Sequence, residues 1–167
     1  MSVNSVSPIS EKVAAFIQQG VAIAVASSNP QLRGSSARAT GCRISPDRKR
    51  ISLIMNQRWG EKLLHDIHTS HRLAAVFCLP ITEQALQIKS SDAVVEALAP
   101  GDWGIVEHYQ AMWEDQLRQL GFDVTLAHTM TRCEPSDMVV VSFSPEAVFE
   151  QTPGPDAGRC FSELAGK

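Results

Sequence analysis

The segments VAIAVA (21–26), ISLIMN (51–56) and QRWGEK (57–62) lie in the stretch 21–77, which decides the fold of this chain. The first segment alternates bulky and small apolar residues, as expected for a strand with one bulky and one small face. A small face indicates that something packs close to the backbone. The polar segment 36–44 reads as a second strand and 51–56 as a third, and the three pair most simply as a meander. The basic, glycine-containing turn that follows them predicts a small barrel that holds an anionic group at its rim.

The remaining elements carry clear boundary signals. Ser10 and Gly20 flank a short helix that begins at Glu11, with serine as the cap and glycine as the end. Periodicity then predicts a helix over 60–70, strands over 73–79 and 84–95, a strongly amphipathic helix over about 103–120 that Gly121 ends, and a last strand over 138–143. The segment 151–158 is too rich in proline and glycine for regular structure.

The sequence contains no internal repeat and no domain boundary. We therefore expect one domain over 1–167, with a helical insertion at about 101–121 and an irregular tail at about 151–167. A chain of 167 residues is long enough to bury a substantial core.

Charge and hydropathy exclude several classes of function. The net charge of -3 and the pI near 5.9 argue against a nucleic-acid partner, because binding to phosphate backbones needs a strongly basic surface. No apolar stretch approaches the roughly 20 residues that span a bilayer, and Met1 to Glu11 has neither the basic start nor the apolar run of a signal peptide. We expect a cytoplasmic protein with no membrane partner.

Neither the cysteines nor the histidines predict a metal site. The four cysteines are widely separated and form no C-x-x-C pair, so buried reduced thiols are expected. His65, His68 and His71 step by three residues, which on a helix spreads the side chains around the surface. G-x-S-x-G, G-x-G-x-x-G and nucleotide-hydrolase phosphate-loop motifs are all missing from the sequence, and no catalytic residue can be named.

The order of elements resembles the FMN-binding split β-barrel proteins of the pyridoxamine 5'-phosphate oxidase-like group, over approximately residues 10 to 98 and 138 to 150. The motifs that carry the resemblance are the opening helix and strand, Arg38-Ala39-Thr40-Gly41-Cys42-Arg43, Met55-Asn56, Lys62 with Ile67 beyond it, Leu86-Gln87-Ile88-Lys89 before Ser90, and the closing strand from Val139 to Pro145.

This resemblance implies a mainly β fold with flanking helices, built as a six-stranded antiparallel split β-barrel. It also implies a homodimer with FMN in a cleft shared by both subunits. By position, Arg38 begins the flavin-contacting strand, which continues through Ala39 and Thr40, and Lys62 is the second basic residue of a serine-arginine-lysine phosphate site. The chain departs from that pattern because Gly60 and Glu61 stand where serine and arginine are expected, so Arg58 becomes the candidate for the missing cation.

Physical chemistry supports the same residues. A phosphate group needs charge-assisted donors, which Arg38, Arg58 and Lys62 can supply as planar forks and a point charge. The rim of the flavin ring needs polar partners, for which Thr40, Asn56 and Gln87 are the candidates. The alternative for the cations is a solvated turn.

Arg43 lies five positions after Arg38, so strict alternation places the two side chains on opposite faces. In the oxidase the matching residue is a lysine that contacts the substrate phosphate. A bulge near Gly41 would let Arg43 keep such a role, and a surface arginine is the alternative.

The sequence therefore predicts an FMN-dependent oxidoreductase that acts on an unidentified small molecule, with a nicotinamide donor as a possible partner. Two alternatives stay open. One is a non-catalytic flavin, deazaflavin or haem binding or storage protein, in which His65, His68, His108 or His128 would be the haem ligand. The other is a structural barrel whose cleft has lost its ligand.

Overall fold

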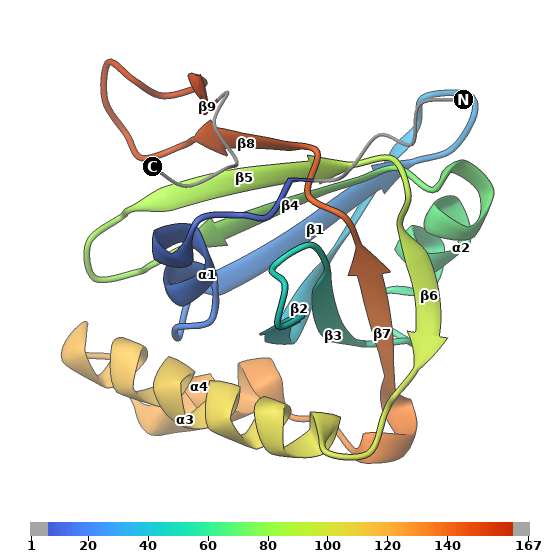
Figure 1. Ribbon diagram of the computed structural model, residues 1–167. Helices are drawn as coiled ribbons and strands as arrows, with labels where there is room; N and C mark the ends of the chain where they lie inside the picture. The colour runs from blue at the N-terminus through green and yellow to red at the C-terminus, as the bar shows by residue number, and fades with distance from the viewer. Residues whose placement is uncertain (1–6, 162–167) are drawn as a thin grey trace.

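A computed structural model describes residues 7–161, which form nine strands and five helices (Figure 1). The helices are α1 (Glu11–Ile17), α2 (Glu61–Ser70), α3 (Asp102–Gln119), α4 (Val124–Thr131) and the short 3-10 helix η1 (Pro135–Asp137). The strands are β1 (Ala22–Ser28), β2 (Gly34–Ile44), β3 (Ile51–Asn56), β4 (Leu73–Cys78), β5 (Ala85–Ser90), β6 (Val94–Ala97), β7 (Met138–Phe143), β8 (Ala147–Glu150) and β9 (Cys160–Phe161). None of the described helices is long and apolar enough to cross a bilayer.

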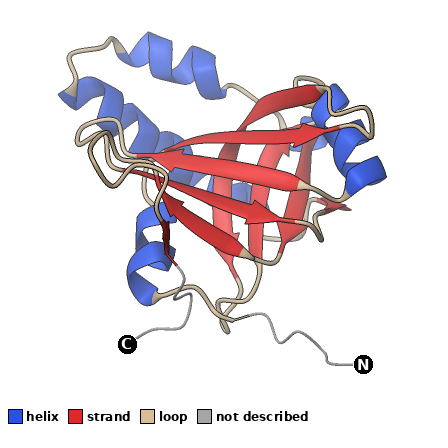
Figure 2. Ribbon diagram, turned by 90° about the horizontal axis from the view of Figure 1, so that it is seen from above, coloured by secondary structure: helices blue, strands red, loops and turns tan. Residues whose placement is uncertain are grey.

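All nine strands belong to one sheet in the order β6-β7-β3-β2-β1-β4-β5-β8-β9, and every pairing is antiparallel. The mainly β architecture with flanking helices is confirmed, and so is the meander of the first three strands. The six-stranded barrel is wrong, because among the described residues the sheet stays open between its edge strands β6 and β9. The sheet is strongly curled, and Figure 2 shows its strands crossing in two directions with helices around them.

The alternating side chains of β1 explain how the sheet faces are used. Ile23 and Val25 are buried in the main core, whereas Ala24 and Ala26 are exposed on the outer face. On the inner face, α2 contributes Leu63, Leu64 and Ile67 to the same core. The predicted bulky and small faces are therefore confirmed, with the bulky face turned inward.

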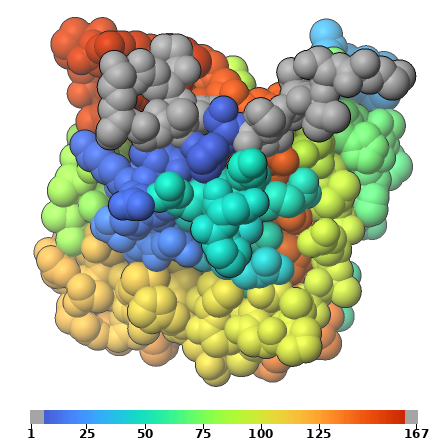
Figure 3. Space-filling view, viewed as in Figure 1, coloured from blue at the N-terminus to red at the C-terminus, as the bar shows by residue number. Residues whose placement is uncertain are grey.

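Helix α3 covers part of the outside of the sheet. Val106 packs with Ile54 of β3 and with Met138 and Val140 of β7 in a second apolar cluster. Farther along the helix, Tyr109 and Trp113 join the main core. Figure 1 shows α3 and α4 side by side below the strands, and Figure 3 shows α1, the β2–β3 hairpin and α3 forming one continuous surface.

The predicted strand 84–95 is wrong as a single element. It is divided into β5 and β6, which lie far apart in the strand order of the sheet. The carboxylate of Asp92 holds the corner between them, because it accepts hydrogen bonds from the Ser90 hydroxyl (2.9 Å) and the Ser144 amide (2.7 Å).

Helix α4 and strand β8 were not predicted. The tail predicted as irregular contains β9, and its last part, 162–167, lies outside the described residues.

Candidate functional site

The strand register assembles a flat apolar surface on the outer side of the sheet. Ala24 pairs with Arg38 on one side and with Val76 on the other, and Val76 pairs with Gln87. Directly paired residues project to the same side of a sheet, so these four side chains form one row. The next row contains Ser36, Ala26, Ala74 and Lys89.

We call Ala24, Ala26, Ala74 and Val76 the alanine face. Ala24 and Ala26 are exposed, and Ala74 and Val76 are half-buried. Arg38 and Gln87 border this face three strand spacings apart, which is about 14 Å. A planar apolar ring can lie on such a surface because no bulky side chain rises from it, and the two polar side chains can contact its edges.

Arg38 is held at this border by helix α3. Its guanidinium carbon lies 5.0 Å from the centroid of the Trp113 ring, a cation–π contact. The neighbouring Tyr109 hydroxyl donates a 2.9 Å hydrogen bond to the Val21 carbonyl. Burial raises the pKa of Tyr109 to about 12, against an opposing effect of the Arg38 charge. Tyr109 is therefore neutral at physiological pH, and its phenol cannot act there as a base.

A β-bulge brings Arg43 to the same side of the sheet as Arg38. Ala39 pairs with Met55 and Cys42 pairs with Leu53, so Thr40 and Gly41 together stand opposite the single residue Ile54. The extra residue cancels the strict alternation, so the condition named for Arg43 from the sequence, a bulge near Gly41, is met.

Arg43 is bound by helix α3. The Arg43 Nε atom donates a 2.7 Å hydrogen bond to the buried carboxylate of Asp102. Ala39 is fully buried in the main core on the opposite face. Thr40 is buried, and its hydroxyl has no hydrogen-bond partner among the described residues.

The three cations expected at one phosphate site have three different partners. Arg38 contacts Trp113, the Arg58 Nε atom lies 3.6 Å from the Asp137 carboxylate, and the Lys62 ammonium lies 2.9 Å from Asp66. Lys62 also donates to the Gly34 carbonyl at 3.4 Å. Of the predicted set, the structure places Arg38 and Gln87 in one row at opposite borders of the alanine face, and it gives Arg58 and Lys62 carboxylate partners of their own.

Asn56 stabilises the turn that leads into α2. Its side-chain oxygen accepts hydrogen bonds from the amides of Arg58 (3.0 Å) and Trp59 (3.3 Å). The same turn and the end of α4 border an open pocket of about 300 Å³ that Arg58, Trp59 and Arg132 help to line. Asn56 thus has a structural task in addition to the flavin contact predicted for it.

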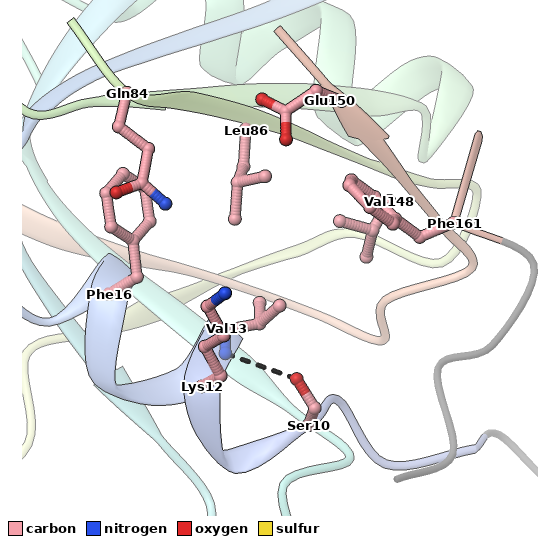
Figure 4. Close-up of a pocket in the computed structure, with 9 residues that line it drawn as sticks. All are labelled: Ser10, Lys12, Val13, Phe16, Gln84, Leu86, Val148, Glu150 and Phe161. Atoms are coloured by element: carbon pink, nitrogen blue, oxygen red, sulfur yellow. Dashed lines mark hydrogen bonds between the residues drawn. The ribbon is translucent and has the colours of Figure 1, made fainter. Parts of the chain in front are cut away.

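A separate pocket of about 180 Å³ lies on the inner side of the sheet, between α1 and strands β5 and β8 (Figure 4). The apolar walls of this pocket come from Phe16, Leu86 and Val148. The Glu150 carboxylate, which also lines it, accepts hydrogen bonds from the backbone amides of Gln151 and Thr152. Leu86 and Gln87 are neighbours on one strand, so their side chains point to opposite faces. This pocket is therefore distinct from the alanine face.

The sequence interpretation overlooked Lys89 as a member of the site. Lys89 follows Gln87 by two residues, and a period of two places both on one face of β5. That signal was readable in the sequence. Ala74 and Val76 become members only through the pairing of β4 with β1 and β5.

Comparison with known proteins supports the fold assignment. The sequence matches no protein-family profile, and no curated protein is significantly similar to it. Among solved structures, HupZ of Group A Streptococcus is similar with a TM-score of 0.54 and 13% identity, over 90% of this chain and 99% of HupZ. A pyridoxamine 5'-phosphate oxidase-related, FMN binding protein of Nostoc punctiforme is similar with a TM-score of 0.52 and 13% identity, over 91% of this chain and 88% of the other.

Proposed function

Because this chain has the fold of the pyridoxamine 5'-phosphate oxidase-like proteins, we propose that it binds FMN on the alanine face and acts as an oxidoreductase on a small substrate. The row of Arg38, Ala24, Val76 and Gln87 on the outer face of the sheet carries this proposal. It offers a smooth apolar floor for the ring system and a polar side chain at each end.

The chain's own residues bind and orient the ring. Ala24 and Ala26 let it approach the backbone, Arg38 offers charged donors at one edge, and the Gln87 amide offers a donor and an acceptor at the other. Bound FMN supplies hydride chemistry, so the protein needs no acid and base pair of its own. Helix α3 keeps Arg38 in place through Trp113.

A second copy of the chain completes the site in this proposal. Ala24 and Ala26 of the alanine face are exposed among the described residues, and a ring lying on them needs a cover to exclude water. A two-fold partner that presents the same face would bury both apolar surfaces. The proposed active species is therefore a homodimer.

Binding of FMN to the full-length protein tests this function. Ala24→Trp fills the middle of the row, so we expect it to weaken FMN binding at least tenfold in a fluorescence titration. Ala15→Trp is the matched control, because Ala15 is an exposed alanine on α1. Unchanged FMN affinity in Ala24→Trp would exclude the alanine face as the flavin site.

Turnover separates an enzyme from a binding protein. We expect slow anaerobic bleaching of the bound flavin by NADH or NADPH, and no appreciable peroxide production from pyridoxamine 5'-phosphate. From Ser144 to Lys167 only Arg159 and Lys167 are cationic, against Glu146, Glu150, Asp156 and Glu163, which is unfavourable for a second phosphate. A flavin that no nicotinamide donor reduces would indicate a store or carrier, and a Soret band in the purified protein would identify haem.

A further inference from the structure

A groove of about 360 Å³ extends the alanine face toward the end of the sheet where α2 leads into β4. Its lining includes Ala26 and Ser28 of β1, Arg72 and Ala74 at the start of β4, and Lys89 and Ser91 at the end of β5. The floor is again made of alanine, because Ala26 pairs with Ala74. Continuing this register by two residues places Ser28 beside Arg72, and Arg72 beside Ser91.

Among residues 7–161, the two cations of this groove have no carboxylate partner. Most other cations of the described chain are paired, including Arg43, Arg50, Arg58 and Lys62. Arg72 and Lys89 are exposed, and within residues 7–161 neither forms an ion pair. The Lys89 ammonium lies 4.6 Å from the centroid of the Phe149 ring, a contact that leaves its donors available.

Two hydrogen bonds hold the backbone of Arg72. The Ser27 hydroxyl donates to the Arg72 carbonyl at 2.7 Å, and the Arg72 amide donates to the Ser70 hydroxyl at 3.2 Å. Two acids lie beside the groove: the Glu146 carboxylate accepts hydrogen bonds from the amide and the hydroxyl of Ser91, and the Asp92 carboxylate accepts one from the Ser90 hydroxyl and is paired with Arg50. The groove thus presents two positive charges on a rigid support.

We propose that Arg72 and Lys89 hold the anionic end of the ligand, a phosphate monoester, in this groove. An arginine fork and a lysine point charge together match a phosphate dianion. Arg72 lies four residues along β4 from Val76, which is about 14 Å. A ring on the row of Val76 can therefore be joined to a phosphate at Arg72 by a short flexible chain. Arg58 and Lys62 then serve the fold through Asp137 and Asp66.

Calorimetric titration of the full-length protein with FMN and with riboflavin tests this assignment, because the two ligands differ only in the phosphate. The wild-type protein is expected to prefer FMN by about tenfold or more, as two charge-assisted contacts predict. Arg72→Gln combined with Lys89→Gln should abolish this preference and leave riboflavin affinity unchanged. Lys12→Gln combined with Lys49→Gln is the control for the lost charge, since both lysines lie outside the groove.

The inference rests on the proposed function for the ring but not for the anion, so the two can fail separately. Inorganic phosphate is the second probe, and its binding is monitored by the NMR chemical shifts of the Ser28 and Ser91 amides. Shifts that vanish in the Arg72 and Lys89 double variant support the anion site even if no flavin binds. An unchanged FMN preference in that variant, a larger loss in Arg58→Gln with Lys62→Gln, or no phosphate-induced shifts at all would overturn the inference.

Discussion

At the scale of single residues, Lys62, which the family resemblance assigns to a phosphate site, has a carboxylate partner in this structure. Asp66 of α2 is buried, and its Oδ2 atom accepts hydrogen bonds from the Ser35 hydroxyl at 2.5 Å and the Lys62 ammonium at 2.9 Å. The Ser35 hydrogen bond, followed by that of Lys62, lowers the pKa of Asp66 below its usual range. These contacts tie α2 to β2.

The lowered pKa of Asp66 predicts a specific pH dependence of stability. A carboxyl with a depressed folded-state pKa stabilises the fold above its unfolded pKa of about 3.9, and this stabilisation is lost as the pH falls through the folded pKa. We expect Asp66→Asn to lower the thermal midpoint at pH 6. The difference from the wild-type protein should shrink as the pH falls below about 4. A difference that stays constant between pH 6 and pH 3 would contradict this role for the Asp66 charge.

At the scale of elements, helix α3 determines much of what surrounds the site. It holds Arg38 through Trp113 and Arg43 through Asp102. It also approaches the chain just before β1 so closely that only glycine fits there. A Cβ atom on Gly20 would lie 2.7 Å from the Met112 carbonyl oxygen and 2.8 Å from its carbonyl carbon. These are helix backbone atoms, which cannot move aside without displacing α3.

Two glycine-to-alanine substitutions should therefore have opposite effects on stability. Gly20→Ala should destabilise the protein by about 1–3 kcal/mol, because it overpacks the contact with α3. Gly104→Ala should stabilise it by up to about 1 kcal/mol, since a Cβ at this position inside α3 meets nothing within 4 Å. Urea unfolding of both variants measures the difference. A neutral Gly20→Ala would mean that α3 is not packed as closely as this structure has it.

At the scale of the whole molecule, the alanine face is an apolar surface that one chain leaves open. Its inner side packs into the core, and we propose that a ligand and a second copy cover its outer side. The groove with Arg72 and Lys89 continues from it, and α3 limits it beyond Arg38. This arrangement favours a two-fold assembly in which the alanine faces of two chains oppose each other.

The mass of the protein in solution tests this assembly. Light scattering at micromolar concentration should give twice the chain mass of 18.2 kDa. Ala26→Arg places a charge in the contact and should give a folded monomer, because Ala26 is exposed within one chain. Ala15→Arg on α1 should remain dimeric. A wild-type monomer that still binds FMN would rule out a cleft shared by two subunits.

The sequence alone determined the elements whose periodicity is local. The alternation of Ile23 and Val25 with Ala24 and Ala26 predicts β1 and its two faces, and the apolar stripe of α3 predicts that helix to within one or two residues. These periodicity signals succeed because the burial of one face within a single element needs no knowledge of its partners. The assignment of Arg38 and Gln87 to a flavin site stays a prediction.

The tertiary structure decided what depends on pairing between distant segments. The order β2-β1-β4-β5 puts Arg38 and Gln87 in one row, and a bulge opposite Ile54 turns Arg43 to the side of α3. The division of 84–95 between the inner strand β5 and the edge strand β6 follows from the corner at Asp92. Such features are set by packing and hydrogen bonds summed over the whole sheet, so no local pattern could have specified which cations are paired and which are free to bind an anion.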